Sequence, residues 1–266
     1  LFRSVLTVFH FLSGKEVGAG EARDYLWAET SPYIAHALGG IDGYAYTNSR
    51  EALERAYENG YRNIEVDFEY SSDGELVLIH NFKRKTLKDL FGIEIKESEK
   101  ALSTDELLSL KIYGKYTPMT MKELIGFMAE HPDIYLILDG KYEEKEEVKR
   151  EYTYLRELSS ERDPDVLKRM IPQIYNEDMF DWIMDIYDWK SVIFTWYRLD
   201  SDSLDPEEIF RFCRDRGIRV CTMEDDCENP LIDKTAEKYG IMVFVHTIND
   251  EKVRDRLFSS GVKGIY

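Results

Sequence analysis

The stretch that decides the fold runs from Ile64 to His80 and reads IEVDFEYSSDGELVLIH. Ile64–Tyr70 and Leu76–His80 are rich in β-branched, aromatic and long apolar residues, which predicts two strands. Asp73-Gly74 lies between them, and this dipeptide is a strong signal for a two-residue hairpin loop because Gly tolerates the positive φ of the turn. The sequence therefore predicts an antiparallel hairpin.

The predicted register of this hairpin gathers polar side chains on one face. With the Asp-Gly dipeptide as the loop, Ser72 pairs with Glu75. Counting outward then places Asp67 opposite His80, and directly opposed residues share a face of the sheet. Glu65 points the same way because it precedes Asp67 by two residues. Two carboxylates and an imidazole at this range suit a metal and acid–base site, whereas a solvated E-x-D face is the structural alternative.

Length and charge limit the classes of function. The chain has 266 residues, enough for one α/β barrel or two smaller domains, and 43% of them are hydrophobic, enough for a sizeable core. The formal net charge is −17, which argues against nucleic-acid binding through basic patches. An anionic substrate would need a local positive centre, and a divalent metal could supply it.

Three cysteines lie late in the chain, at positions 213, 221 and 227. Their odd number argues against a disulfide framework and favours free thiols. A single Cys213–Cys221 or Cys221–Cys227 bridge stays open as an alternative, so cysteine usage does not decide the compartment.

The first residues form a separate lead-in. Leu1–Leu12 is apolar but too short to span a bilayer, and we predict no stable membrane span in this chain. The stretch is either the stub of a removed signal or anchor, or an amphipathic helix that covers the barrel, and we favour the helix. We assign residues 1–32, with a short helix within 21–32, to a lead-in and residues 33–266 to one domain.

Strands and helices alternate along most of the chain. Asn48 is a suitable N-cap for a helix that ends before Gly60, and residues 82–118 form a polar insertion that we expect to lie over the barrel mouth as a lid. Apart from the return strand of the hairpin, the short loops imply parallel strands joined by crossover helices. The pattern predicts a (β/α)₈ barrel with strands that begin near Ile34, Ile64, Ile134, Met170, Val192, Arg219, Met242 and Gly264.

Barrel enzymes place their sites at the C-terminal ends of the strands. Polar groups that close a buried strand are costly unless they have partners, so their convergence at one end favours a site over a core. The candidate residues at these ends are His36, Glu65, Asp67, His80, Asp139, Lys141, Gln173, Tyr175, Trp196 and His246.

The candidate residue types suggest phosphodiester cleavage. Glu65, Asp67 and Asp139 offer hard oxygen ligands without thiolate, which suits Mg²⁺ or Ca²⁺. His36 and His80 titrate near neutrality and could act as general base and general acid. The alternative for Asp139 is a helix N-cap.

The sequence resembles the glycerophosphodiester phosphodiesterase family, within the wider group of phospholipase-C-like phosphodiesterases. The matching pieces run in family order from Tyr33 to the C-terminus. They are IAHALGG, NSREALERAYENGYRNIEVDFEYSSDGELVLIH, LSTDELLSL followed by TPMTMKELI, YLILDGK, PQIY, VHTIND and GVKGIY.

The resemblance implies that two histidines, His36 and His80, carry out the acid–base catalysis. It also implies that Lys141 contacts the phosphate and that the three carboxylates hold one divalent cation. Gln173, Tyr175, Trp196 and His246 are the further residues that we expect to bind a small phosphodiester or lipid-headgroup substrate.

The chain departs from the family pattern beside the first histidine. Ala37-Leu38 stands where the family usually has Arg and Gly, Asn81 stands where it has Asp, and Ile41–Thr47 resembles an insertion. Asp139 replaces a more common Glu, and an Asp-x-Lys ending also occurs in sphingomyelinase-D-like phospholipases. Two alternatives therefore stay open: a sphingomyelinase-D-like enzyme that releases a cyclic phosphate, and a silent barrel that binds a phosphate or polyol.

Overall fold

The computed structural model describes residues 23–94, 101–199 and 205–266, so the predicted helix over Leu1–Leu12 lies outside the described residues. The strands form one curled sheet in the order β2-β1-β3-β4-β5-β6-β7-β8, in which β2 is antiparallel to β1 and the other pairs are parallel. The strands are β1 (Asn63–Tyr70), β2 (Leu76–Val77), β3 (Tyr135–Gly140), β4 (Met170–Ile174), β5 (Ile193–Thr195), β6 (Val220–Glu224), β7 (Met242–His246) and β8 (Gly264–Ile265).

Residues 33–35 join the two ends of the parallel sheet. Tyr33 bridges Ile265 of β8 and Ala35 bridges Ile64 of β1, both in parallel orientation. With this short segment as the first position, the sheet confirms the predicted α/β barrel with its additional antiparallel strand. The strand expected to begin near Ile34 is short, because His36–Leu38 forms the 3₁₀ turn η1 with positive φ at Ala37 and Leu38.

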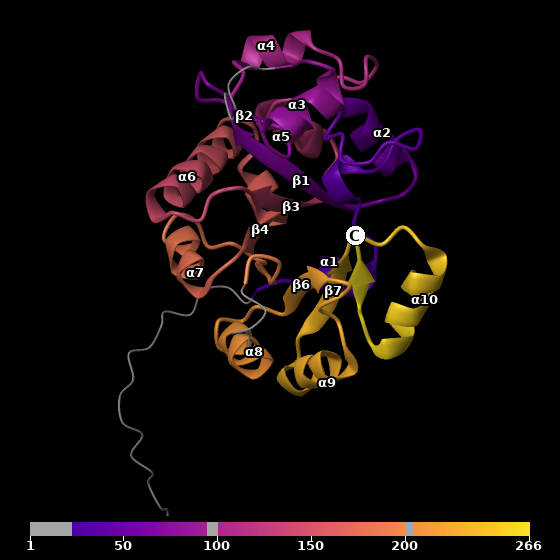
Figure 1. The fold of residues 1–266 in the computed structure, drawn as a ribbon. Helices are drawn as coiled ribbons and strands as arrows, with labels where there is room; N and C mark the ends of the chain where they lie inside the picture. Colours follow the sequence, from indigo (N-terminus) through magenta and orange to yellow (C-terminus); the bar gives the residue numbers. More distant parts are fainter. Residues whose placement is uncertain (1–22, 95–100, 200–204) are drawn as a thin grey trace, which may run out of the picture.

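Helices α6 to α10 alternate with the strands and lie around the outside of the sheet (Figure 1). Ser103 and Thr120 both form complete capping boxes at the starts of α4 and α5, with the glutamate three residues later reaching back. The helices are α1 (Leu26–Thr30), α2 (Arg50–Glu58), α3 (Arg84–Phe91), α4 (Thr104–Ser109), α5 (Met121–Glu130), α6 (Lys145–Arg162), α7 (Glu177–Met184), α8 (Pro206–Asp215), α9 (Pro230–Tyr239) and α10 (Glu251–Ser260), with a second 3₁₀ turn, η2 (Pro164–Arg169).

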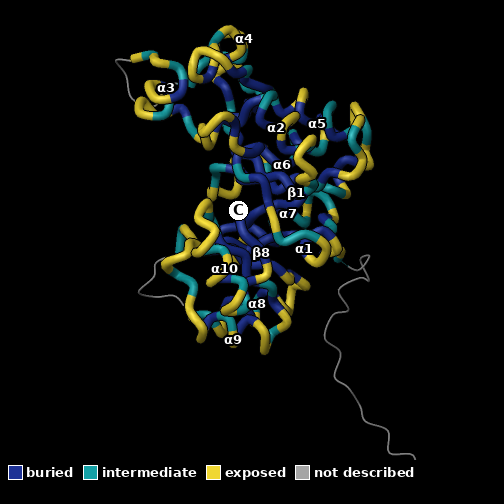
Figure 2. The backbone as a smooth tube through the Cα atoms, turned by 90° about the vertical axis from the view of Figure 1, so that its right-hand side faces the viewer, coloured by how far each residue is buried: buried dark blue, intermediate teal, exposed yellow. Residues whose placement is uncertain are grey.

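An apolar layer fills the N-terminal end of the barrel. Neighbouring strands each contribute one side chain to it, and Tyr25 and Trp27 of the lead-in pack against them. Trp27 is only 1% exposed, so this part of the lead-in belongs to the barrel core. The strand residues are Ile137, Ile171, Ile193, Val220 and Phe244. Figure 2 shows the buried strands in dark blue inside helices with exposed outer faces.

The cysteines are free, as predicted. Cys213 and Cys221 are both buried, and their sulfurs lie 3.6 Å apart, well beyond the length of a disulfide bond. Cys227 is half-buried.

The predicted hairpin register is wrong by one residue. Glu69 pairs with Val77 and Tyr70 with Leu76, so Ser71, not Ser72, lies opposite Glu75. The loop therefore has three residues. Ser71 supplies the reason, because its backbone N–H donates to Glu75 O (2.9 Å) while its Oγ accepts from Glu75 N (3.0 Å).

As a result, strand pairing does not place His80 opposite Asp67. Strand β2 ends at Val77, and the N–H of the next residue, Leu78, donates to Met119 O (2.9 Å). This contact directs the chain away from β1 before it reaches His80. His80 nevertheless lines the same cavity as Asp67, and the loop that follows β2 places it there.

Candidate active site

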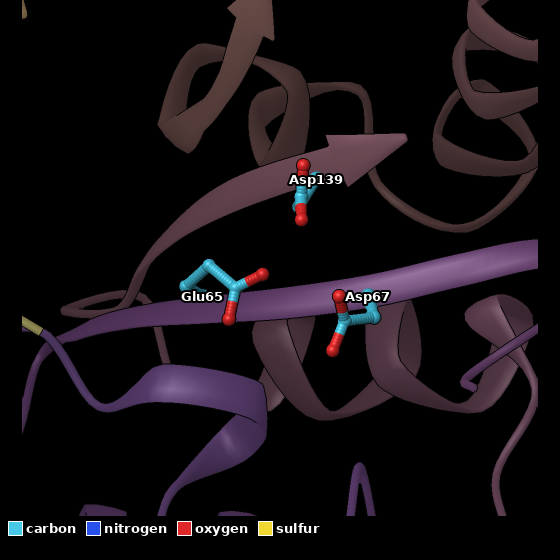
Figure 3. A group of neighbouring side chains, drawn as sticks. All are labelled: Glu65, Asp67 and Asp139. Carbon is cyan, nitrogen blue, oxygen red and sulfur yellow. The ribbon is translucent and has the colours of Figure 1, made fainter. Parts of the chain in front are cut away.

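Three carboxylates meet at the C-terminal ends of β1 and β3 (Figure 3). Asp67 lies opposite Asp139 in the parallel register, and Glu65 points to the same side because it lies two residues earlier on β1. One ligand oxygen from each carboxylate lies within 4.8 Å of the other two. The predicted metal ligands are therefore together in the structure, and all three are buried.

Glu65 is fully buried, and within the described part of the chain only one of its two oxygens is hydrogen-bonded. Its Oε2 accepts a hydrogen bond from Ala37 N (2.6 Å), whereas its Oε1 has no partner among the described residues. Burial raises the pKa of Glu65 well above its usual range, and the charges of Asp67 and Asp139 add to the effect. A buried carboxylate oxygen without a partner, facing two more carboxylates, fits a hard divalent cation.

Lys141 brings a positive charge to the cluster. Its Nζ lies 2.6 Å from Asp67 Oδ1 and 2.6 Å from Asp139 Oδ2. Burial alone would raise the pKa of Asp67, but Lys141 and then His80 outweigh burial, so the pKa of Asp67 is lowered. Asp67 is thus held as an anion.

Asn48 holds Asp67 from the other side, a role that the sequence did not suggest. Its amide group donates to Asp67 Oδ2 (2.9 Å) and accepts from Asp67 N (3.1 Å). The prediction of Asn48 as the N-cap is wrong. Ser49 is the N-cap of α2 and accepts from Ala52 N, whereas Asn48 has a φ of +47° that turns it toward β1.

His36 begins η1 beside the cluster. Its Nε2 lies 3.7 Å from Glu65 Oε2, and its Nδ1 lies 2.9 Å from Thr247 Oγ1. Burial lowers the pKa of His36, although Asp67 and Asp139 oppose this effect. The imidazole is therefore neutral near pH 7, the form that accepts a proton.

A cavity of about 680 Å³ opens over the carboxylates and contains both predicted catalytic histidines. Helix α3 of the polar insertion contributes Thr86, Asp89 and Leu90 to its wall, so the insertion lies at the barrel mouth as expected. The other lining residues are His36, Ala45, Tyr46, Asp67, His80, Tyr113, Asp139, Tyr197, Glu224, Asp225, Asp226, His246 and Thr247.

Two of the four further candidates for substrate binding lie close to the cluster. His246 lines the cavity, and burial together with His36 lowers its pKa to about 4. The hydroxyl of Tyr175 hydrogen-bonds to Asp139 Oδ1 and to Gly140 O, so it orients a carboxylate and does not line the cavity.

The other two lie away from the cavity wall. Gln173 is buried and accepts from Tyr266 OH (3.4 Å). Trp196 is 2% exposed and packs against Phe210 of α8, between the sheet and the helix layer. Its neighbour Tyr197 lines the cavity in its place.

No helix among the described residues is both long enough and apolar enough to cross a membrane.

The fold and the site define an α/β-barrel enzyme whose polar groups gather at the C-terminal ends of the strands. The sequence model of the glycerophosphoryl diester phosphodiesterase family matches residues 40–266, and the chain belongs to this family. Its class of activity is that of a glycerophosphodiester phosphodiesterase. His36 lies just before the matched residues, so the family model does not cover it, and only the structure places it beside the carboxylates. Comparison with curated proteins finds no match.

Solved structures share the fold at low sequence identity. A phosphodiesterase from Oleispira antarctica, solved with the product sn-glycerol-3-phosphate, aligns with a TM-score of 0.71 at 17% identity over 90% of this chain and 94% of that one. A glycerophosphodiester phosphodiesterase from Thermotoga maritima aligns with a TM-score of 0.65 at 20% identity, over 88% and 92% of the two chains. One from Parabacteroides distasonis aligns with a TM-score of 0.66 at 20% identity, over 88% and 91%.

Proposed function

We propose that the protein is a metal-dependent phosphodiesterase that cleaves a glycerophosphodiester-like substrate to a phosphomonoester and an alcohol. The observation that carries the proposal is the buried carboxylate cluster at a cavity lined by His36 and His80. The family membership supports the reaction class, and the sn-glycerol-3-phosphate bound to the Oleispira antarctica relative supports a small phosphodiester as the substrate.

Glu65, Asp67 and Asp139 would hold the cation, and their all-oxygen donor set suits Mg²⁺ or Ca²⁺. When bound, the ion supplies positive charge that neutralises phosphate oxygens and makes the phosphorus more electrophilic. Lys141 is the protein's own cation at this place and would contact a second phosphate oxygen. Together these charges allow an anionic substrate to bind a chain with a net charge of −17.

The two histidines would share the proton transfers. The neutral imidazole of His36 takes the proton from the attacking hydroxyl, whose oxygen forms a bond to phosphorus. His80, on the cavity wall, gives a proton to the oxygen of the leaving alcohol as the second phosphorus–oxygen bond breaks. The remaining predicted contacts, Tyr175 and His246, would act by orienting Asp139 and by contacting the substrate, respectively.

A sphingomyelinase-D-like reaction is the second candidate, and the Asp139-Gly140-Lys141 sequence favours it. In that reaction the attacking hydroxyl belongs to the substrate, so the product is a cyclic phosphate. The identity of the product separates the two reactions.

Phosphorus NMR tests both candidates. Glycerophosphocholine, glycerophosphoglycerol, a lysophospholipid and sphingomyelin are each incubated with Mg²⁺, Ca²⁺ or chelator. We expect metal-dependent formation of a monoester, and a loss of roughly 10²- to 10⁴-fold in the rate for His36→Ala. The matched control is His131→Ala, because His131 lies at the end of α5 and contacts Phe127 rather than the site.

The possible results point in different directions. A cyclic product would support the sphingomyelinase-D-like reaction. Metal binding to the folded protein without turnover of any of the four substrates would contradict the proposed activity and favour the silent binding barrel.

A further inference from the structure

Three residues from distant parts of the chain form a hydrogen-bonded row at the cavity wall. Tyr46 OH donates to Thr247 Oγ1 (3.0 Å), and Thr247 Oγ1 lies 2.9 Å from His36 Nδ1. The rings of Tyr46 and His36 also meet edge to face, with centroids 4.9 Å apart. All three residues line the cavity, so the row lies at its edge and next to the carboxylates.

The row is built by the segment Ile41–Thr47, the insertion that follows the first histidine. A tight turn joins Ile41 to Tyr44, and Tyr46 has a φ of +58°, which directs its side chain back over His36. A non-glycine residue in this region costs free energy, so the contacts of Tyr46 must compensate for it. Thr247 follows directly on strand β7, which pairs with β8.

The two ring nitrogens of His36 have different surroundings. Nδ1 is engaged by Thr247, whereas Nε2 lies 3.7 Å from Glu65 Oε2, which is too far for a hydrogen bond. Nε2 is therefore the nitrogen available for proton transfer. To accept a proton there, the neutral ring must carry its own proton on Nδ1, and that N–H needs an acceptor.

Thr247 Oγ1 fits that need. A hydroxyl oxygen has two lone pairs, so it accepts from His36 Nδ1–H and from Tyr46 OH at the same time. We propose that Thr247 and Tyr46 are positioning residues that fix the tautomer and the ring orientation of His36, with Nε2 free toward the cavity. The kinetic part of this inference rests on the proposed phosphodiesterase function, whereas the tautomer itself does not.

Nitrogen-15 NMR of the histidine side chains tests the tautomer without substrate or turnover. Protein labelled on histidine is compared with His36→Gln, whose missing signals assign His36. We expect the wild-type ring to carry its proton on Nδ1, and Thr247→Val to shift the population toward the Nε2–H form. Thr247→Ser keeps the hydroxyl and should restore the wild-type signals. A wild-type His36 protonated on Nε2, or unchanged signals in Thr247→Val, would overturn the proposal.

Kinetics then test the consequence. Thr247→Val should lower kcat by roughly two- to twelvefold, the equivalent of one neutral hydrogen bond, with little change in KM, and Thr247→Ser should recover most of the loss. Tyr46→Phe should have a smaller effect in the same direction. Tyr44→Phe is the matched control, because Tyr44 belongs to the same segment and its ring stacks on Tyr113 away from His36.

A loss of activity must be distinguished from a loss of folded structure. Thermal unfolding of each variant reports loss of structure, and Thr247→Ser or Tyr46→Phe still tests the proposal if Thr247→Val does not fold. If no substrate is turned over, the proposed function fails while the tautomer measurement stands. If Thr247→Val turns over substrate at the wild-type rate, the positioning role is wrong even though the enzyme assignment holds.

Discussion

At the residue scale, the site depends on buried carboxyl groups with unequal surroundings. Asp67 is held as an anion by Lys141 and Asn48, whereas Glu65 has one oxygen without a partner. A fourth carboxyl, Glu151 of α6, lies just behind the cluster and is 1% exposed. Gly140 has no side chain there, and a Cβ at this position would overlap the carboxyl of Glu151. This close packing explains why a glycine separates Asp139 from Lys141.

The pH dependence of stability should report on Glu151. Burial raises the pKa of this carboxyl well above its usual range, and its Oε1 has no partner among the described residues. The folded state then binds more protons than the unfolded state between about pH 4.3 and the raised pKa of Glu151, so in this range the group makes the protein less stable as pH rises. In Glu151→Gln the penalty is absent.

We therefore expect the free energy of unfolding of Glu151→Gln, relative to wild type, to increase between pH 5 and the raised pKa of Glu151, by at most about 1.4 kcal/mol per pH unit. Urea unfolding at several pH values measures the difference. Glu157→Gln, on the exposed face of the same helix, should show no such trend. A difference for Glu151→Gln that is constant with pH would contradict this account.

At the element scale, the hairpin that decides the fold is held by its loop. Gly74 has a φ of +91°, as the third residue of a three-residue loop requires, and Asp73 Oδ1 accepts from the backbone N–H and the hydroxyl of Thr104. The hydrogen bonds from Thr104 to Asp73 hold the loop against the start of α4. The loop therefore connects strand β1, which carries Glu65 and Asp67, to the polar insertion.

Gly74→Ala should destabilise the protein by about 1–2 kcal/mol, because the alanine must adopt the left-handed region. Space is not the cause, since a Cβ there would lie 3.8 Å from the nearest atom, Arg150 Nη2. Gly126→Ala is the matched control. Gly126 lies inside α5 with nothing near its Cβ position, so alanine should stabilise that helix by up to about 1 kcal/mol. Equal effects at the two glycines, measured by urea unfolding, would contradict the conformational explanation.

At the scale of the whole molecule, the barrel is closed by two isolated bridges, from Tyr33 to Ile265 of β8 and from Ala35 to Ile64 of β1. The apolar layer fills the end of the barrel opposite the site. Gly264 of β8 lies against the Phe244 ring of that layer, and a Cβ on this glycine would overlap the ring. Closure of the barrel at β8 therefore needs a residue without a side chain.

Gly264→Ala should lower the free energy of unfolding by about 1–3 kcal/mol through overpacking. Phe244→Leu makes room at the cost of buried apolar contact, so the double variant should lose less than the sum of the two single variants. Thermal or urea unfolding of the four proteins measures this coupling. Additive losses would mean that the glycine and the ring do not compete for the same space.

The sequence by itself determined the alternation of strands and helices, and with it the barrel and the ends of β1 and β3 at which the carboxylates lie. These features depend on periodicity and local turn chemistry, which act between near neighbours. The E-x-D spacing on one strand and the Asp139 position on the next were enough to bring three carboxylates together, because parallel strands end at the same edge.

Only the tertiary structure decided which side chains face the cavity and what holds them. Ser71 rather than Ser72 lies opposite Glu75, which shifts the hairpin register by one residue. Asn48 binds Asp67 and does not cap a helix, and Tyr197 rather than Trp196 lines the cavity. The row from Tyr46 through Thr247 to His36 joins residues about 200 positions apart. Such contacts follow from the direction of each chain segment after the barrel closes, and a local sequence pattern carries no information about that direction.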